Sequence, residues 1–181
     1  MLKKLPNEAY GLSLSLVEIS DASDIVALRS SPELTKYMVT VEKNVEKQEE
    51  WINEYKKREQ RGEDLYFAYR QKDLLVGFAR ISHINYEKGT CSLSSWIKNP
   101  AVQSVGSRML LSRFDIAFEY LNLNEVHASI HKDNNKALRH WQCFNCSLEG
   151  KENGYNNVAI SIEEYYKIKD SYYKKFIKNL I

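Results

Sequence analysis

The apolar positions of the chain follow two periods, one typical of strands and one typical of helices. Residues 12–16 alternate between leucine and serine, which predicts a strand with one buried face. The apolar positions then shift to Val17 and Ile19, as a bulge would make them do. Two further strand-like runs, Leu65–Arg70 and Leu74–Asn85, are joined by a short polar turn and predict an antiparallel hairpin.

Two helices are expected before this hairpin. Asp21 or Ser23 can cap a first helix that extends through Arg29. Residues 44–61 are highly charged but carry a narrow apolar stripe, which is typical of a helix that lies on the protein surface.

The second half of the chain contains a strand, a helix and a strand in direct succession. The runs Thr90–Ile97 and Asn124–His131 have the composition of strands. A helix buried along one side is predicted between them from the spacing of Leu110, Leu111, Phe114, Ala117, Phe118 and Leu121. Such a crossover favours parallel pairing of the two strands inside an otherwise antiparallel sheet. The expected fold class is therefore α+β with a mixed sheet.

Three elements are expected after this unit. A helix over Asn134–Phe144 precedes a hairpin that turns at residues 150–154. Residues 166–181 place apolar side chains at intervals of four among lysines, which predicts a C-terminal amphipathic helix. That helix could lie on an anionic membrane, but packing on its own domain or on a second subunit is the favoured interpretation.

Length and composition indicate one domain, residues 1–181, built around one core. The chain has 181 residues, of which 43% are hydrophobic. Its 26 Lys and Arg nearly balance its 24 Asp and Glu, so the global charge gives no reason to expect nucleic acid. No signal peptide and no bilayer-spanning run is recognisable, so we expect a cytoplasmic protein. Three cysteines without an export signal are expected to be reduced thiols.

A polar loop over residues 99–107 leads directly into the long predicted helix. Its glycine, Gly106, stands at the helix N-terminus. The first-turn amides of a helix have no partners inside it, and the helix dipole adds partial positive charge there. Such a junction suits a phosphate, and a glycine lets the backbone approach it closely.

The order of the elements and the residues of this loop resemble the GNAT superfamily of N-acetyltransferases, which move an acetyl group from acetyl-CoA to an amine. The family's loop, Gln/Arg-x-x-Gly-x-Gly/Ala, corresponds to Gln103–Arg108, with Arg108 in place of the last small residue. The family's Asn, Ala and usually Tyr on a later helix correspond to Asn134, Ala137 and Trp141. The resemblance covers residues 12–165 and implies a mostly antiparallel mixed sheet with a central splayed parallel strand pair and flanking helices.

The resemblance also implies acetyl-CoA as the cofactor. Its pyrophosphate is expected on the amides of residues 105–108, with Arg108 adding a charge, and its pantetheine arm between the splayed strands. Asn134 would bond the amide region of the cofactor, cap its own helix, or do both. The cofactor-binding residues expected from the resemblance are Trp96, Ile97, Lys98, Gln103, Ser104, Val105, Gly106, Ser107, Arg108, Asn134, Ala137 and Trp141.

Within the superfamily, residues 29–32, 96–100 and 134–150 are similar to the branch that acetylates nucleotide-linked amino sugars for surface glycans. The first expectation is therefore the primary amine of such a sugar, held between residues 29–41, the turn at residues 83–89 and the final hairpin. Ribosomal-protein and polyamine acetyltransferases share much of the pattern, so a protein N-terminus or a polyamine is the alternative acceptor. The third interpretation is a degenerate acetyltransferase fold that binds CoA but does not catalyse a reaction.

Acetyl transfer needs a neutral amine, a stabilised oxyanion and a proton for the leaving thiolate. A backbone N–H of the splayed strand can stabilise the oxyanion. The candidate bases are His131, Ser95, Ser94, His83 and His127, of which the first two are the expected catalytic residues. Trp141 stands where the family usually has a Tyr, and its indole cannot act as a titrating acid. A core aromatic filling the space of that Tyr is the favoured interpretation of Trp141.

No metal is expected in this chain. His140, Cys143 and Cys146 have suggestive spacing, but a structural zinc needs four ligands, and burial of the cysteines as small apolar groups is favoured. The expected partner is a small-molecule amine, and a homodimer is left open. Neither nucleic acid nor stable insertion into a membrane is expected.

Overall fold

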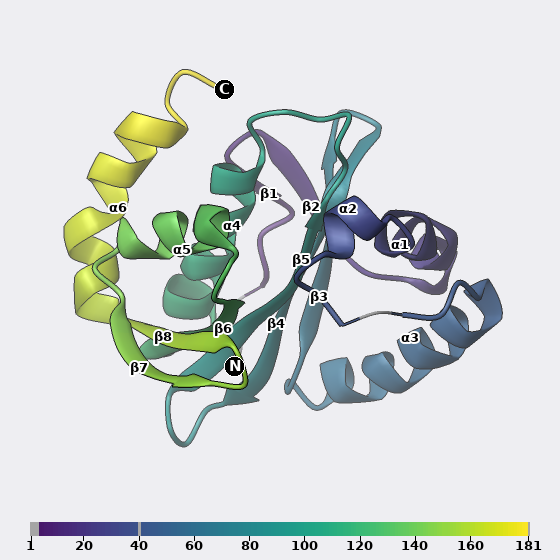
Figure 1. Cartoon of the computed structure of the whole chain (residues 1–181), viewed down its shortest axis with the longest axis horizontal. Coiled ribbons are helices and arrows are strands. Elements are labelled where there is room, and N and C mark those ends of the chain that lie inside the picture. Colours follow the sequence, from purple (N-terminus) through teal and green to yellow (C-terminus); the bar gives the residue numbers. More distant parts are fainter. Residues whose placement is uncertain (1–3, 40, 181) are drawn as a thin grey trace.

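An eight-stranded sheet with the strand order β1-β2-β3-β4-β5-β6-β8-β7 runs through the middle of the protein, in a computed structural model that describes residues 4–39 and 41–180 (Figure 1). Every neighbouring pair is antiparallel except β5 and β6, which confirms the expected α+β class with a mixed sheet. The strands are β1 (Glu8–Ala9), β2 (Leu12–Leu16), β3 (Leu65–Gln71), β4 (Leu74–Asn85), β5 (Thr90–Lys98), β6 (Glu125–His131), β7 (Ser147–Glu152) and β8 (Tyr155–Ser161).

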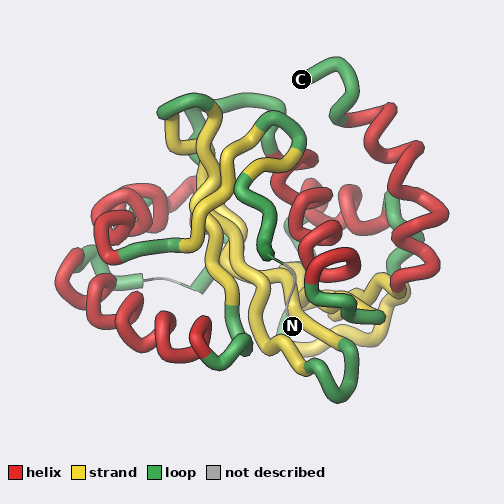
Figure 2. The backbone as a smooth tube through the Cα atoms, turned by 180° about the vertical axis from the view of Figure 1, so that it is seen from behind, coloured by secondary structure: helices red, strands yellow, loops and turns green. Residues whose placement is uncertain are grey.

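Helices cover both faces of the sheet. Figures 1 and 2 show α1, α2 and α3 on one side and α4, α5 and α6 on the other. Their bounds are α1 (Ala22–Arg29), α2 (Pro32–Thr35), α3 (Val45–Gln60), α4 (Gly106–Asp115), α5 (Asn135–Gln142) and α6 (Ile162–Phe176). A π-helical turn over Ile116–Tyr120 continues α4. Within the described residues, no helix combines the length and the apolar character that crossing a bilayer requires.

The parallel strands β5 and β6 pair only at their beginning. Their register joins Thr90 to Glu125, Cys91 to Val126 and Ser92 to His127, and pairing stops there although β5 continues to Lys98. On the other edge of β5, Phe78 pairs with Ile97 and Arg80 with Ser94, so two β5 residues oppose one β4 residue. This bulge includes Ser95 in the left-handed region, with φ of 46°. The resulting bend accompanies the separation of β5 from β6, as the resemblance implied.

The helix α4 is buried between the sheet and α6. Its predicted apolar face is confirmed, because Leu110, Leu111 and Phe114 have no exposed surface. The C-terminal helix starts at Ile162, before the predicted start, and ends at Phe176, and it packs on its own domain. Tyr172 is 2% exposed and its ring centroid lies 4.5 Å from that of Phe144. This packing agrees with the favoured interpretation of the helix.

The N-terminal predictions hold in outline and fail in detail. The shift of apolar positions after β2 is not a bulge, because the strand ends at Leu16 and a 3-10 turn follows, in which Ile19 is 45% exposed. Asp21 precedes α1 but its side chain does not cap that helix. The Asp21 carboxylate instead accepts from the backbone N–H of Glu18 and pairs with Arg70 at 2.6 Å.

Candidate active site

Three adjoining cavities line the opening between β5 and β6. The α2 groove is the cavity lined by residues 37–39, in the loop after α2, with a volume of about 610 Å³. The α4 groove is the cavity at the start of α4, with a volume of about 770 Å³. A smaller inner cavity of about 140 Å³ shares Ser94 and Ser95 with the α2 groove and Trp96, Asn134 and Ala137 with the α4 groove. Two ligands entering from opposite sides could therefore meet at the inner cavity.

The N-terminus of α4 faces the α4 groove without a side-chain cap. Its N-cap residue is Val105, and no side chain accepts from the first-turn amides, whereas Asn44, Asn134 and Ser161 cap α3, α5 and α6. The first helical hydrogen bond joins the Met109 amide to the Val105 carbonyl at 3.0 Å. The amides before Met109 are consequently free to bind an anion.

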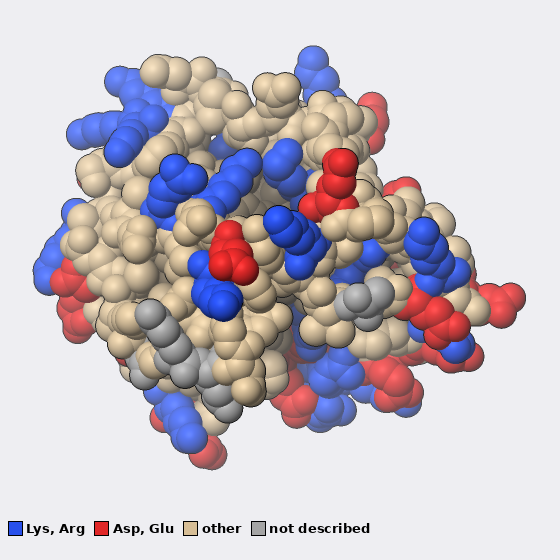
Figure 3. All heavy atoms as spheres, viewed as in Figure 1, with Lys and Arg blue, Asp and Glu red and all other residues tan. Residues whose placement is uncertain are grey.

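Basic side chains surround the same groove. Lys98, Lys136 and Lys175 line it, and no Asp or Glu is among its described lining residues. Figure 3 shows Lys and Arg side chains gathered around a hollow in the upper part of this face of the molecule. An uncapped helix N-terminus among lysines suits phosphate groups. Lys175 comes from the end of α6, so the C-terminal helix contributes to this groove.

Gly106 allows Trp96 to pack against the helix N-terminus. A Cβ at Gly106 would lie 3.3 Å from Cζ2 of the Trp96 ring, which is tighter than ordinary contacts. The Trp96 ring lines both the α4 groove and the inner cavity. Its Nε1 is buried and has no hydrogen-bond partner among the described residues. This unpaired donor can bind an acceptor group of a ligand that passes from the groove to the inner cavity.

Most of the expected cofactor-binding residues come together around the α4 groove. Those that line it are Trp96, Ile97, Lys98, Gln103, Ser104, Gly106, Ser107, Asn134 and Ala137. Asn134 also caps α5, because its Oδ1 accepts from the Ala137 amide at 3.2 Å. Trp141 lines the inner cavity but is 3% exposed and packs edge-on against Phe114, as the interpretation of it as a core aromatic predicted.

Val105 and Arg108 differ from the expectation. The Val105 side chain is fully buried in the core, so only its backbone is near the groove. The Arg108 guanidinium was expected to add charge at the phosphates, and this is wrong. It is 2% exposed and donates to the carbonyls of Ser104 and Tyr10 and to Gln71 Oε1. Those acceptors hold the guanidinium beneath the helix, away from the α4 groove.

The α2 groove lies where the acceptor site was expected. Residues 37–39, His83 and Tyr155 line it, from the loop after α2, from the end of β4 and from the final hairpin. The rings of Tyr37 and Tyr155 both lie near the His131 ring, at centroid distances of 5.1 and 5.3 Å. Aromatic rings in this arrangement suit stacking on a flat or ring-shaped ligand.

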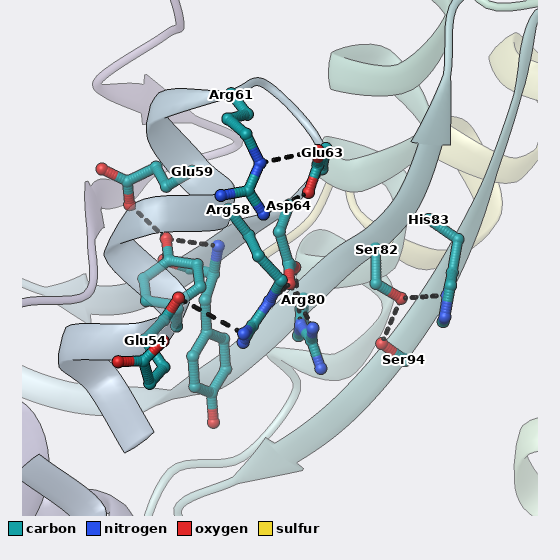
Figure 4. Close-up of polar contacts among 12 residues, drawn as sticks. Glu54, Arg58, Glu59, Arg61, Glu63, Asp64, Arg80, Ser82, His83 and Ser94 are labelled. Atoms are coloured by element: carbon teal, nitrogen blue, oxygen red, sulfur yellow. Dashed lines mark hydrogen bonds and ion pairs between the residues drawn. The ribbon is translucent and has the colours of Figure 1, made fainter. Parts of the chain in front are cut away.

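Two arginines give the α2 groove a positive charge. Arg80 lies against Asp64, which is 1% exposed and which Arg58 also contacts, at 3.0 Å (Figure 4). Arg29 donates to the Val39 carbonyl at 2.9 Å, and its Nε is buried without a partner. Burial lowers the pKa of the Arg29 guanidinium, and no described carboxylate pairs with it. No Asp or Glu is among the described residues that line this groove.

A chain of hydrogen bonds leads from the opening between the strands to the protein surface. Ser94 Oγ lies 2.9 Å from Ser82 Oγ, and Ser82 Oγ lies 3.2 Å from His83 Nδ1 (Figure 4). Ser82 is 1% exposed, whereas His83 is exposed. The three side chains can carry a proton from the α2 groove to solvent. Ser94 and His83 were candidates from the sequence; Ser82 was missed because a serine on a strand carries no signal of its own.

The two expected catalytic residues lie at the centre of the site. Ser95 lines both the α2 groove and the inner cavity, and His131 lines the inner cavity. His131 Nδ1 accepts from the Asp133 amide at 3.3 Å and lies 3.7 Å from Asp133 Oδ2. His127 lines the α2 groove and has its Nε2 3.0 Å from Glu125 Oε1.

The residues considered as metal ligands have other contacts. His140 Nδ1 lies 2.9 Å from the Tyr172 hydroxyl, and burial lowers the pKa of His140. Cys143, Cys146 and Cys91 form no disulfide with one another. Among residues 4–39 and 41–180, no group of three or more His, Cys, Asp or Glu side chains is arranged to hold a metal ion.

Comparison with known proteins gives a consistent family assignment. The acetyltransferase (GNAT) domain family matches residues 12–142. The acetyltransferase PseH of Campylobacter jejuni subsp. jejuni serotype O:23/36 (strain 81-176) is 26% identical over 132 residues, which cover 73% of this chain and 80% of PseH.

Solved structures share the whole architecture. Apo FdhC, described as a nucleotide-linked sugar GNAT, has a TM-score of 0.83 and 24% identity, over 94% of this chain and 97% of its own. Spermidine N-acetyltransferase from Vibrio cholerae, in complex with CoA and spermine, has a TM-score of 0.73 and 20% identity, over 86% of this chain and 98% of its own. At these identities the likeness establishes the fold.

Proposed function

The chain belongs to the GNAT family of acetyltransferases, and from this premise we propose that it acetylates the primary amine of a nucleotide-linked amino sugar. Acetyl-CoA is the acetyl donor of the family. The α4 groove fits such a donor by its uncapped helix N-terminus, its three lysines and the unpaired Nε1 of Trp96. When bound, acetyl-CoA supplies a thioester that is activated toward an amine.

The observation that carries the choice of acceptor is the charge of the α2 groove. Two arginines and no described Asp or Glu line it, and Arg29 has no carboxylate partner. A diphosphate-bearing acceptor is attracted by this charge, whereas a polyamine is repelled by it. The aromatic rings of Tyr37 and Tyr155 suit a base or a sugar. The description of FdhC as a nucleotide-linked sugar GNAT agrees with this reading.

The residues of the site divide the chemical work between them. Arg29 and the two tyrosines hold the acceptor, with its amine toward the inner cavity. Ser94 takes the proton that the amine loses and passes it through Ser82 to His83. The bulged backbone at Ser95 and Trp96 leaves the regular ladder, so its N–H groups can stabilise an oxyanion.

A substrate panel tests the proposal. Release of free CoA thiol from acetyl-CoA is followed with a nucleotide-diphosphate-linked 4-amino sugar, the corresponding free amino sugar, spermidine and a peptide with a free N-terminus. We expect kcat/KM for the nucleotide-linked sugar to exceed that for spermidine by at least about hundredfold. A preference for spermidine or for the peptide would establish the alternative acceptor. A thermal shift with CoA but no turnover of any amine would indicate a binding module.

A further inference from the structure

Arg113 on α4 is a buried cation without an acidic partner. It is 1% exposed, and its one hydrogen bond among the described residues runs from Nε to the Met109 carbonyl of its own helix, at 3.4 Å. No described carboxylate forms an ion pair with it. An isolated buried charge destabilises a fold strongly, so such a group calls for an explanation.

Arg80 and Arg108 have partners that Arg113 lacks, whereas Arg29 shares with Arg113 the absence of a described carboxylate partner. Arg80 is held by Asp64, and Arg108 donates to three oxygen atoms. The Arg113 guanidinium instead lies over the Trp96 ring, with its Cζ 5.1 Å from the ring centroid. Burial lowers the pKa of Arg113 to about 10, so it remains charged at neutral pH. The fold thus keeps a positive charge among neutral aromatic groups.

The position of this charge points to the reaction. Arg113 lines the inner cavity together with Ser95, Trp96, Asn134 and Trp141. The α2 groove and the α4 groove meet there, so the bond that breaks must be close to it. A leaving thiolate needs either a proton or a positive charge beside it. Trp141 cannot donate a titrating proton, and the described lining of the inner cavity contains no Tyr other than Tyr37, which belongs to the α2 side.

We propose that Arg113 stabilises the departing CoA thiolate by its fixed charge, in place of a general acid. The amine nitrogen forms a bond to the acetyl carbon, and the carbon–sulfur bond then breaks with its electron pair going to sulfur. The proton from nitrogen leaves through Ser94, Ser82 and His83. The thiolate departs as an anion beside Arg113 and takes a proton from solvent after release. This inference rests on the acetyl-CoA chemistry of the proposed function and is independent of which amine is acetylated.

The test is the ionisation of the CoA thiol when CoA is bound to the protein. The ultraviolet absorbance of the thiolate is recorded against pH, with bound desulfo-CoA as the reference that removes the tyrosine signal. A free thiol has a pKa of about 8.5. A neighbouring cation lowers such a pKa by about one unit or more, which raises the thiolate fraction at pH 7 roughly tenfold. If CoA bound to the wild-type protein ionises at or above the pH of free CoA, the proposal is overturned.

Two variants separate this role from a structural one. Arg113→Met removes the charge at similar side-chain length, and we expect the bound thiol to regain its ordinary pKa and kcat to fall by about 10²-fold or more. Arg113→Lys keeps the charge, so it should retain part of the lowered thiol pKa. The surface control Arg139→Met removes one charge from a residue that lines none of the three cavities and should leave the titration unchanged.

The Tm of Arg113→Met distinguishes a role of Arg113 in the reaction from a structural role. Replacing an unpaired buried charge by an apolar side chain is expected to leave the Tm unchanged or to raise it. A Tm that falls sharply in Arg113→Met, with an unaltered thiol titration, would show that the residue is structural and would overturn the proposal. Failure of the substrate panel alone would leave the thiol titration unaffected, so the two proposals fail separately.

Discussion

Ser92 on β5 and His127 on β6 form the last pair of the only parallel ladder in the described sheet. Beyond this pair β5 bends at the bulge of Ser95, and the two strands line a cavity instead of sharing hydrogen bonds. Backbone groups that a sheet normally pairs are thereby available to ligands from both sides. Because the ladder between the two strands ends at this pair, the sheet opens here into the cavities of the candidate site.

The close approach of Trp96 to Gly106 predicts that even a small side chain at this position disturbs CoA binding. The Cβ of Gly106→Ala would press on the Trp96 ring at 3.3 Å, and the branched side chain of Gly106→Val would displace it. We expect roughly tenfold weaker CoA binding for the Val variant and a smaller loss for Ala, because overpacking costs about 1–3 kcal/mol. Calorimetric titration with CoA measures this. Unchanged affinity of Gly106→Val would refute the assignment of the α4 groove.

Arg29 should set the affinity for an anionic acceptor. Arg29→Ala removes the carboxylate-free guanidinium of the α2 groove, and a hydrogen bond to a charged group is worth about 1.5–3 kcal/mol. We expect KM for the nucleotide-linked sugar to rise by roughly 10- to 100-fold and its dependence on salt to weaken, with KM for acetyl-CoA unchanged. The exposed Lys57→Ala on α3 is the matched control for loss of a charge. Equal effects of both variants on KM would contradict the site.

The chain from Ser94 to His83 should determine the rate of amine acetylation. His83 has φ of 53°, a backbone conformation that Asn tolerates, so His83→Asn removes the imidazole with little backbone strain. We expect kcat/KM to fall by about 10²-fold, because a general base contributes about 10²–10⁴-fold. Ser82→Ala should give a comparable loss, because it breaks the same chain of hydrogen bonds. An unchanged kcat/KM in His83→Asn would place the base elsewhere, with His131 and His127 as the next residues to vary.

Tyr66 should make the fold sensitive to alkali. Burial raises the pKa of Tyr66 from 10.0 to about 12, so the folded state holds the phenolic proton more tightly than the unfolded state does. The stabilisation is complete below pH 10 and is lost as the pH rises toward 12, by roughly 3 kcal/mol. The hydroxyl is buried without a partner, so Tyr66→Phe should keep the Tm at pH 7 or raise it. It should also reduce the alkaline loss of stability, to which other tyrosines with a raised pKa, such as Tyr172, contribute as well. Chemical denaturation at several pH values checks both, with the exposed Tyr166→Phe as the control.

Much of the architecture follows from periodicity alone. The hairpin of β3 and β4, the amphipathic α4 and the strand β6 appear close to their predicted bounds, since each buries one face with a clear repeat. The start of α6 at Ile162 was missed because the preceding strand and the first helical turn form one continuous run of mixed polarity. The sequence predicts a bulge after β2 and not the observed 3-10 turn, because the apolar Ile19 continues the alternation of a strand although its side chain is exposed.

The sequence predicts the backbone amides of the site but not the contacts of its buried arginines. A helix preceded by a glycine-containing polar loop predicts an anion site, because the unpaired amides are a property of any helix N-terminus. The partners of Arg108 and the isolation of Arg113 could not be predicted, because the sequence places both arginines on one helix without showing what each guanidinium contacts. The difference arises from tertiary contacts. The Arg108 guanidinium donates to Tyr10 and Gln71, whereas the Arg113 guanidinium lies over the Trp96 ring and has no carboxylate partner among the described residues.

The central claim is that CoA binds across the opening between β5 and β6. Hydrogen exchange of the wild-type protein, measured with and without CoA, maps the contact directly. We expect slower exchange in residues 94–98, 104–109 and 134–137, which border the α4 groove and the inner cavity, and no change in α3. Protection confined to other segments, or none at a CoA concentration that shifts the Tm, would show that CoA does not bind at this opening.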